Sequence, residues 1–166
     1  MICKKCGKEI ADNSTFCSEC GAKQVDIYKE VFVRKGTDEK EFLANINKWF
    51  QTHPKAANIK CSLEMDASVG LMANKYTLNQ VVLEYELFAT DNTNQYAIVK
   101  EESYALAKMS TKDYVGKWTE QHPNCKVVTW KGGVHTRGST GSHLLGGFGA
   151  TNRMNVYIFF KFPRKK

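Results

Sequence analysis

The chain has 166 residues, of which 42% are hydrophobic and 25% charged, and this composition predicts a folded protein rather than a disordered one. No run of apolar residues approaches the length of a membrane-spanning helix, and the first residues lack the apolar stretch of a secretory signal. We therefore expect a cytoplasmic protein with one main domain and room for a small appendage.

Four cysteines stand within the first 20 residues, in two pairs that each enclose two residues. The pairs are Cys3 with Cys6 and Cys17 with Cys20. Close pairs of thiols in a reducing compartment indicate metal binding or redox chemistry. Two intervening residues let both sulfurs reach one ion at about 2.3 Å, and four sulfurs close a tetrahedral zinc site with no open catalytic position. A dithiol redox site and an iron–sulfur cluster are the alternatives.

Each cysteine pair is followed by a glycine, Gly7 or Gly21. Glycine can turn the chain at positive φ and so direct backbone N–H groups toward the sulfurs. Ile10 and Phe16 are the bulky apolar residues between the pairs, and we expect them to form a very small core. Because so short a segment cannot bury enough surface to offset chain entropy, we predict that it is unfolded without metal.

Residues 1–22 resemble the short zinc ribbon found at the N-terminus of many bacterial and archaeal proteins. The resemblance rests on residues 3–7 (CKKCG) and residues 16–21 (FCSECG). It implies one structural zinc ion held by Cys3, Cys6, Cys17 and Cys20. It implies no activity, because such ribbons are attached to many unrelated proteins.

A β-α-β-β order follows a short linker at residues 23–26. Hydrophobic periodicity predicts, in chain order, a strand at 27–35, a helix between the caps Thr37 and Asp38 and the breaker His53-Pro54, and strands at 59–65 and 77–88. In the last of these strands Glu84 and Glu86 alternate with apolar residues, and we expect both carboxylates to face solvent.

The second half repeats this order. It predicts a strand at 96–106, a helix at 110–121, and strands at 126–130 and 155–162. Residues 48–54 resemble residues 117–123, which indicates an internal duplication. The expected fold is therefore an α+β domain over residues 27–166, a duplicated β-α-β-β module with repeats at 27–92 and 95–162. It would contain about six antiparallel or mixed strands, with two helices packed on one face.

Several single residues allow a structural interpretation. His53 and His122 both precede proline at a helix end, which favours a role in capping. Cys61 and Cys125 are expected to be small buried side chains. The strand at residues 156–162 is apolar on both faces, so we expect it to be central or covered on both sides, with an edge position as the alternative.

A glycine-rich stretch, residues 132–152, holds seven of the twelve glycines. We interpret it as a flexible hairpin loop, although His135, Arg137 and His143 could help it to cradle an anion. It matches no phosphate-binding loop pattern.

The positive charge is concentrated at the C-terminal end. Residues 1–120 contain 16 basic and all 17 acidic residues, whereas residues 121–166 contain eight basic residues and no acid. These eight are Lys126, Lys131, Arg137, Arg153, Lys161, Arg164, Lys165 and Lys166. Such an asymmetry favours an anionic partner, although a basic tail that serves solubility is the alternative.

The sequence therefore predicts a zinc-binding, non-catalytic protein whose basic residues engage nucleic acid or another polyanion. A second hypothesis is a protein–protein adaptor that uses the ribbon and the apolar last strand. A third is an enzyme with a site in the glycine-rich loop.

Overall fold

The computed structural model describes residues 1–12, 14–24, 26–69, 74–88, 90–105, 109–137 and 151–164. After the N-terminal ribbon, the helices and strands follow in this chain order: β1 (Tyr28–Val33), α1 (Glu39–Thr52), β2 (Ala56–Val69), β3 (Asn74–Leu87), β4 (Asn94–Ala105), α2 (Thr111–Gln121), β5 (Lys126–Arg137) and β6 (Thr151–Pro163).

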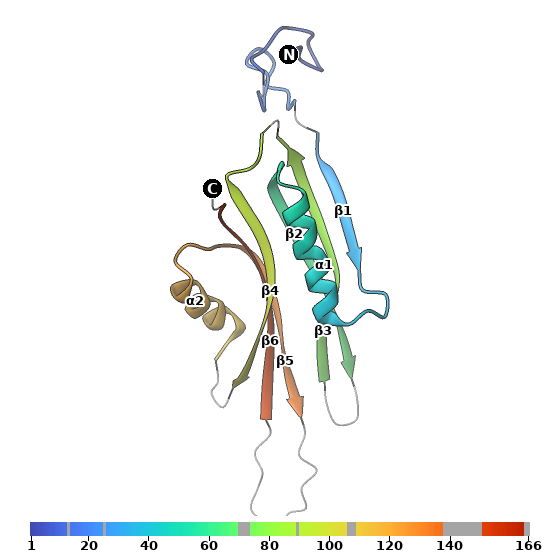
Figure 1. Cartoon of the computed structure of the whole chain (residues 1–166), viewed down its shortest axis with the longest axis vertical. Coiled ribbons are helices and arrows are strands. Elements are labelled where there is room, and N and C mark those ends of the chain that lie inside the picture. The colour runs from blue at the N-terminus through green and yellow to red at the C-terminus, as the bar shows by residue number, and fades with distance from the viewer. Residues whose placement is uncertain are drawn as a thin grey trace, which may run out of the picture.

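The six strands form two antiparallel sheets, one from each half of the chain (Figure 1). The strand order is β1-β3-β2 in the first sheet and β4-β6-β5 in the second, so the third strand of each half is central. The predicted α+β fold with a repeated β-α-β-β order is therefore confirmed.

The helix ends follow from local sequence. Asp38 accepts hydrogen bonds from the N–H groups of Lys40 and Glu41 at the start of α1, and Ser110 accepts one from Asp113 at the start of α2. His53 and His122 are the C-caps. Capping by these two histidines is the predicted arrangement.

The same aromatic arrangement closes both helices. The imidazole of His53 stacks on Trp49 with 4.3 Å between ring centroids, and its Nδ1 lies 2.9 Å from the Trp49 carbonyl oxygen. His122 stacks on Trp118 at 4.1 Å, with Nδ1 2.7 Å from the Trp118 carbonyl. The duplicated sequence motif thus builds the same local structure twice.

The two helices pack on different sides of the second sheet, whereas the sequence predicts that both lie on one face. Tyr157 and Phe159 of β6 join α1 and the first sheet in one core cluster. Ile158 and Phe160 point the other way and pack with Trp118 of α2 in a second cluster. Because β6 is apolar on both faces, each face needs its own cover. Figure 1 shows α1 beside β4 and α2 flanking the second sheet on the opposite side.

The glycine-rich stretch begins and ends as strand rather than loop. Gly132 and Gly133 belong to β5, and residues 138–150 lie outside the described residues. A Cβ on Gly133 would lie 2.5 Å from the ring of Tyr76 in β3, and a Cβ on Gly132 would lie 3.0 Å from the Thr111 methyl group in α2. Gly133 is therefore needed where β5 approaches the first sheet, and Gly132 allows a close approach between β5 and α2.

Candidate functional site

The four N-terminal cysteines lie together in the folded ribbon. The Sγ atoms of Cys3 and Cys20 are 3.7 Å apart, and those of Cys6 and Cys17 are 3.6 Å apart. All four sulfurs lie within 4.8 Å of one another. Each cysteine pair comes from one hairpin, and the two hairpins are closed by the bridges Ile2–Glu9 and Phe16–Lys23.

These distances fit a tetrahedral metal ion. Four sulfurs at 2.3 Å from a central zinc would be about 3.8 Å from one another, close to the observed separations. A disulfide requires about 2.05 Å, and the four cysteines are free thiols. Among the described residues the donor set is four thiols, which suits zinc, and four protein ligands would complete its tetrahedral coordination.

The backbone of the ribbon favours the thiolate form of one of the four cysteines, Cys3. Gly7 and Gly21 adopt φ values of 71° and 67°, as predicted from the sequence. The turn before Gly7 lets the N–H groups of Lys5 and Cys6 point at the sulfur of Cys3, each at 3.4 Å. The hydrogen bond from Cys6 outweighs desolvation and lowers the pKa of Cys3 to about 6.

The small core of the ribbon differs from the prediction at one residue. Ile10 is buried and packs with Cys3 and Cys17, as expected. Phe16 is 60% exposed instead of buried. The bridge between Phe16 and Lys23 sets the ring on the outside of the ribbon, where it lines a groove against the first sheet.

The basic C-terminal residues whose side chains the structure describes do not gather in one place. Lys126 and Lys161 are cross-strand neighbours, whereas Arg153 lies eight residues earlier in β6, about 26 Å away along the strand. Arg153 forms an ion pair with Glu102. Lys131 is exposed at the edge of the sheet.

For Arg137 and Arg164, two of the remaining basic residues, the structure gives the backbone contacts. Arg137 pairs with Thr151 in the β5–β6 ladder, and the backbone N–H of Arg164 donates to the Thr93 carbonyl. Lys165 and Lys166 lie outside the described residues, as does His143 of the glycine-rich stretch. His135 lies in β5, opposite Arg153.

A chain of charged groups, absent from the sequence-based prediction, links the two halves of the protein. Lys100 in β4 contacts Glu39 at the start of α1 at 2.5 Å and Glu102 at 2.7 Å. Burial by itself would raise the pKa of Glu39, but hydrogen bonds from Lys100 and Tyr157 outweigh it and hold the pKa below its usual range. Glu39 lies 61 positions from Lys100 and 118 from Tyr157, so no local sequence motif predicts this cluster.

The same cluster completes the backbone hydrogen bonding of β3. The β1–β3 ladder ends at Val33 and Gln80, and Leu78 lies beyond it. The Leu78 N–H is 3.2 Å from the Tyr157 hydroxyl oxygen and 3.3 Å from a Glu39 carboxylate oxygen, and the Tyr157 hydroxyl donates to Glu39. Side chains from α1 and β6 therefore replace a missing strand.

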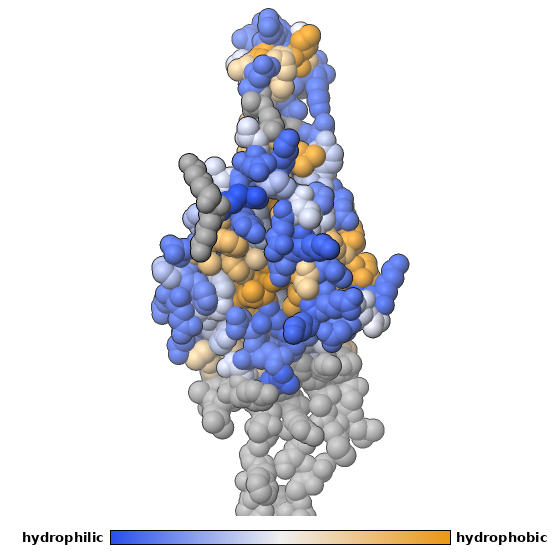
Figure 2. Space-filling view, viewed as in Figure 1, coloured by the Kyte–Doolittle hydropathy of each residue, from blue (hydrophilic) through white to orange (hydrophobic). Residues whose placement is uncertain are grey.

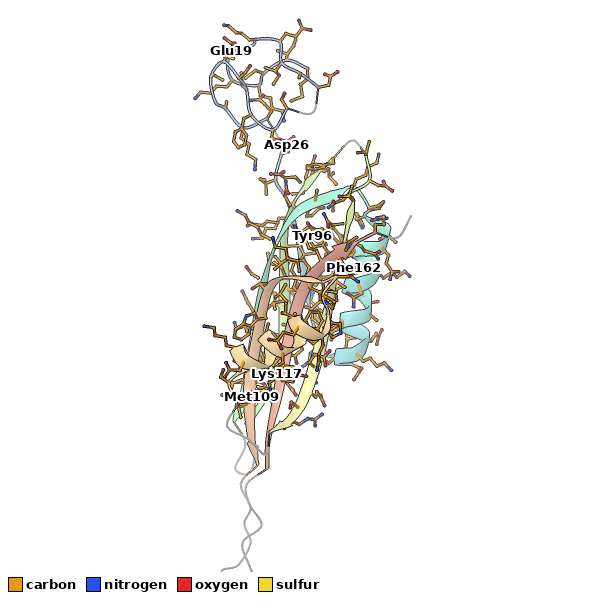
Figure 3. All side chains as sticks on the ribbon, turned by 90° about the vertical axis from the view of Figure 1, so that its left-hand side faces the viewer. Glu19, Asp26, Tyr96, Met109, Lys117 and Phe162 are labelled. Atoms are coloured by element: carbon orange, nitrogen blue, oxygen red, sulfur yellow. The ribbon has the colours of Figure 1, made fainter. Side chains whose placement is uncertain are left out.

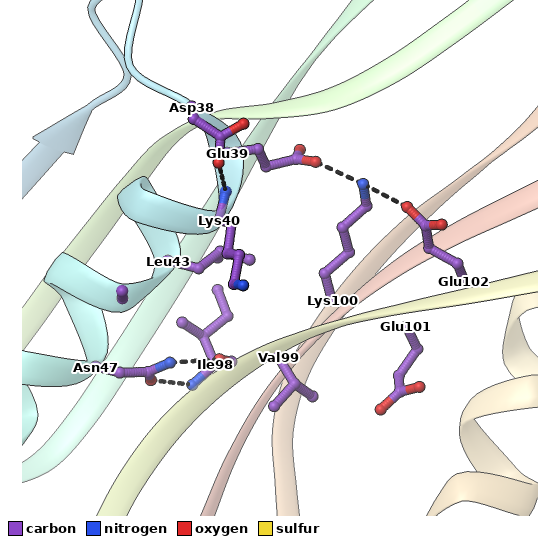
Figure 4. Close-up of a pocket in the computed structure, with 11 residues that line it drawn as sticks. Asp38, Glu39, Lys40, Leu43, Asn47, Ile98, Val99, Lys100, Glu101 and Glu102 are labelled. Atoms are coloured by element: carbon purple, nitrogen blue, oxygen red, sulfur yellow. Dashed lines mark hydrogen bonds and ion pairs between the residues drawn. The ribbon is translucent and has the colours of Figure 1, made fainter.

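An open groove of about 640 Å³ lies beside this cluster, between α1 and β4 (Figure 4). Asn47 spans it and bonds both backbone groups of Ile98, its amide donating to the carbonyl and accepting from the N–H at 2.9 Å each. The Asn47 side chain thus forms with the edge strand β4 the two backbone hydrogen bonds that a neighbouring strand would form. The polar groups drawn in Figure 4 are largely engaged with one another.

The position of Glu86 also differs from the one predicted from the sequence. Alternation along the strand predicts that this carboxylate faces solvent, but the residue is only 5% exposed. Lys23 of the ribbon contacts it at 2.6 Å and the Asn58 amide donates to it at 2.7 Å. The hydrogen bonds from Lys23 and Asn58 hold the pKa of Glu86 below its usual range. Glu84, on the same face, is exposed as predicted.

Comparison with known proteins identifies the ribbon. A family model described as a zinc-ribbon domain matches residues 2–24, which confirms the resemblance inferred from the cysteine spacing. No curated protein and no solved structure matches the chain. Neither of the helices in the described residues is long and apolar enough to cross a membrane.

Proposed function

We propose that the chain binds one structural zinc ion through Cys3, Cys6, Cys17 and Cys20 and acts in the cytoplasm as a non-catalytic binding protein. The sulfur separations of 3.6 and 3.7 Å support the metal site. A reducing compartment keeps such thiols available for metal. The charged cluster around Glu39 has its main groups engaged in holding the two halves together, which favours a structural role for it over catalysis.

The partner that we propose is a polyanion, with nucleic acid as the first candidate. The observation that carries this proposal is the direct pairing of Lys126 with Lys161 across neighbouring strands. Like charges in this position destabilise a sheet. Within the described residues no carboxylate forms an ion pair with either lysine. A phosphate group between the two ammonium groups would relieve their repulsion.

Binding of labelled single-stranded RNA, single-stranded DNA and duplex DNA from low to moderate salt tests this proposal. Lys126→Glu with Lys161→Glu should weaken binding and reduce the slope of log affinity against log salt by about two, or one for each lysine. Lys112→Glu with Lys117→Glu makes the same charge change on exposed positions of α2 and is the matched control. Absence of binding at low salt, or equal loss in the control, would reject the proposal.

The protein–protein adaptor is a second candidate, and it now depends on the ribbon alone. The last strand, one of its two expected contact surfaces, is buried, with Tyr157 and Phe159 at 0% exposure. On the ribbon, in contrast, Ile2 is 69% and Phe16 is 60% exposed. Co-purification with the wild type but not with Ile2→Ser plus Phe16→Ser would favour the adaptor over the polyanion.

A further inference from the structure

The ribbon is attached to the first sheet by more than its chain connection. Lys23, whose backbone pairs with Phe16 in the second hairpin of the ribbon, reaches Glu86 near the end of β3 at 2.6 Å. Figure 3 shows Asp26 at the junction between the ribbon, which carries Glu19, and the two sheets. The side chain of Glu86 is only 7% exposed, against 41% for Lys23. A carboxylate so well buried requires its charged partner.

The first sheet is shaped to receive this contact. The β2–β3 register shifts between Ala57 and Lys60, and within this bulge Asn58 adopts a φ of 50°. This left-handed conformation is uncommon for a residue other than glycine and carries a local cost. It directs the Asn58 amide to the second oxygen of Glu86, at 2.7 Å. The bulge and the ion pair together hold both oxygens of one carboxylate.

The position of Lys23 depends in turn on the metal-binding hairpin. The Gly21 N–H donates to the Cys17 carbonyl and the Cys17 N–H donates to the Ala22 carbonyl, at 2.9 and 2.8 Å. Gln24, the residue after Lys23, donates its backbone N–H to the Thr15 carbonyl, and its side-chain oxygen accepts a hydrogen bond from the N–H of Lys4. Lys23 is therefore placed by the same turn that brings Cys17 and Cys20 together.

The docked ribbon also creates a groove that neither part forms by itself. Its volume is about 390 Å³. Phe16 and Lys23 line it from the ribbon, and Ile27, Lys60 and Glu84 line it from the first sheet and its approach. Figure 2 shows the ribbon as a narrow lobe at this end of the molecule.

We propose that the ribbon is a metal-dependent latch, closed by the Lys23–Glu86 ion pair, that controls the groove at the end of the first sheet. With zinc bound, the ribbon is folded, Lys23 is fixed over Glu86 and the groove exists. When the metal is removed, the ribbon loses its fold, Lys23 leaves β3 and Glu86 becomes hydrated. The inference rests on the zinc binding proposed above.

Residue-resolved NMR relaxation of the full chain, loaded with zinc, tests the latch. In the wild type, the ribbon amides should show the rotational correlation time of the sheets, because the two parts tumble together. Glu86→Gln or Lys23→Met should shorten the correlation time of the ribbon alone, and the swap Lys23→Glu with Glu86→Lys should restore part of it. Glu84→Gln, an exposed position on the same face, is the matched control.

The result that would overturn the latch is a ribbon that tumbles independently in the zinc-loaded wild type, or a ribbon that Glu86→Gln disturbs no more than Glu84→Gln does. Lys23→Met guards against a folding defect in β3, because it removes the ion pair from the ribbon side. If it leaves the tumbling unchanged, the ion pair does not hold the ribbon.

A chelator titration tests the metal dependence and separates the two proposals. Removal of zinc should shift the Asn58 and Glu86 amide resonances and leave those of Ile158 and Trp118, in the second half, unchanged. Elemental analysis of the same sample gives the metal content. A purified chain without zinc contradicts the proposed function, whereas one zinc per chain with unchanged Asn58 and Glu86 resonances contradicts only the latch.

Discussion

The two halves of the chain share one topology but differ in what covers the second face of their sheets. In each half the helix covers one face of the central strand: Leu83 of β3 lies in the α1 cluster, and Phe160 of β6 in the α2 cluster. The neighbouring positions face the other way, and here the halves diverge. Phe159 packs against α1 and the first sheet, whereas Val82 lies on a face that neither described helix covers, beside exposed Val31 and Val33.

This difference shows that a few residues on the central strand decide whether one face or both faces of the sheet are covered. Tyr157 and Phe159 make the second sheet apolar on both faces, so that it packs on the first half as well as on its own helix. Gln80, Val82 and Glu84 leave the outer face of the first sheet more polar. The ribbon docks at the end of that face through Glu86.

The largest effect that tests this comparison should follow from loss of a metal ligand. Cys17→Ser should abolish zinc binding and unfold the ribbon, because the metal contributes on the order of 10–16 kcal/mol to folding in such peptides. Metal analysis and hydrogen exchange of the Ile10 amide, which donates to the Met1 carbonyl, measure this. Cys125→Ser, outside the ribbon, should retain the metal. A protected Ile10 amide in metal-free protein would contradict the prediction.

The next largest effect should distinguish the second faces of the two sheets. Phe159→Ala removes a ring at 0% exposure between the halves and should lower the free energy of unfolding by about 3–5 kcal/mol. Val82→Ala, at the matching position on the open face, should cost about 1 kcal/mol. Urea unfolding of both variants provides the measurement. Similar losses would mean that the open face is covered in solution.

The contact between β5 and the first sheet can be tested with glycine. Gly133→Ala should destabilise the protein by about 1–3 kcal/mol, because its Cβ would lie 2.5 Å from the Tyr76 ring. Gly116→Ala in α2, where nothing lies within 4 Å, should instead stabilise it by up to about 1 kcal/mol. Thermal unfolding of the pair distinguishes a steric effect from a general intolerance of alanine.

The ion pairs between the halves should make stability depend on pH. The pKa of Glu39 is lower in the folded chain than its ordinary value of about 4.3, so the folded state holds this proton less tightly than the unfolded state. The ionised Glu39 carboxylate therefore contributes fully to the free energy of unfolding when the pH is above the ordinary pKa of glutamate. This contribution is lost as the pH falls through the lowered pKa of the folded state. Glu39→Gln should therefore flatten the rise of unfolding free energy with pH in the acidic range. Parallel curves for variant and wild type would contradict this.

The smallest effect concerns the feature that the halves share. His53→Ala and His122→Ala each remove an imidazole that is stacked on tryptophan and bonded to a helix carbonyl, and each should cost about 0.5–1.5 kcal/mol. Chemical denaturation of both variants tests the equivalence. A large difference between the two losses of unfolding free energy would show that the two caps, although alike in geometry, do not stabilise the protein equally.

The sequence determined by itself those features that depend on neighbours a few residues apart. Two residues between cysteines, followed by glycine, predict the metal ligands because a short hairpin can satisfy a tetrahedral ion locally. Asp38 and Ser110 cap helices through N–H groups two or three residues away, and periodicity identifies the repeated β-α-β-β order.

Only the tertiary structure decided which faces and charges meet. Glu86 alternates with apolar residues as a solvent-facing side chain would, but it is buried and accepts a hydrogen bond from Lys23, 63 positions earlier. Phe16 looks like a core residue of the ribbon, but its bridge to Lys23 turns it outward. Lys100 forms an ion pair with Glu39, which lies 61 positions earlier in the sequence. Such contacts depend on how whole sheets stack, and stacking is set by the summed apolar area of many residues rather than by any local spacing.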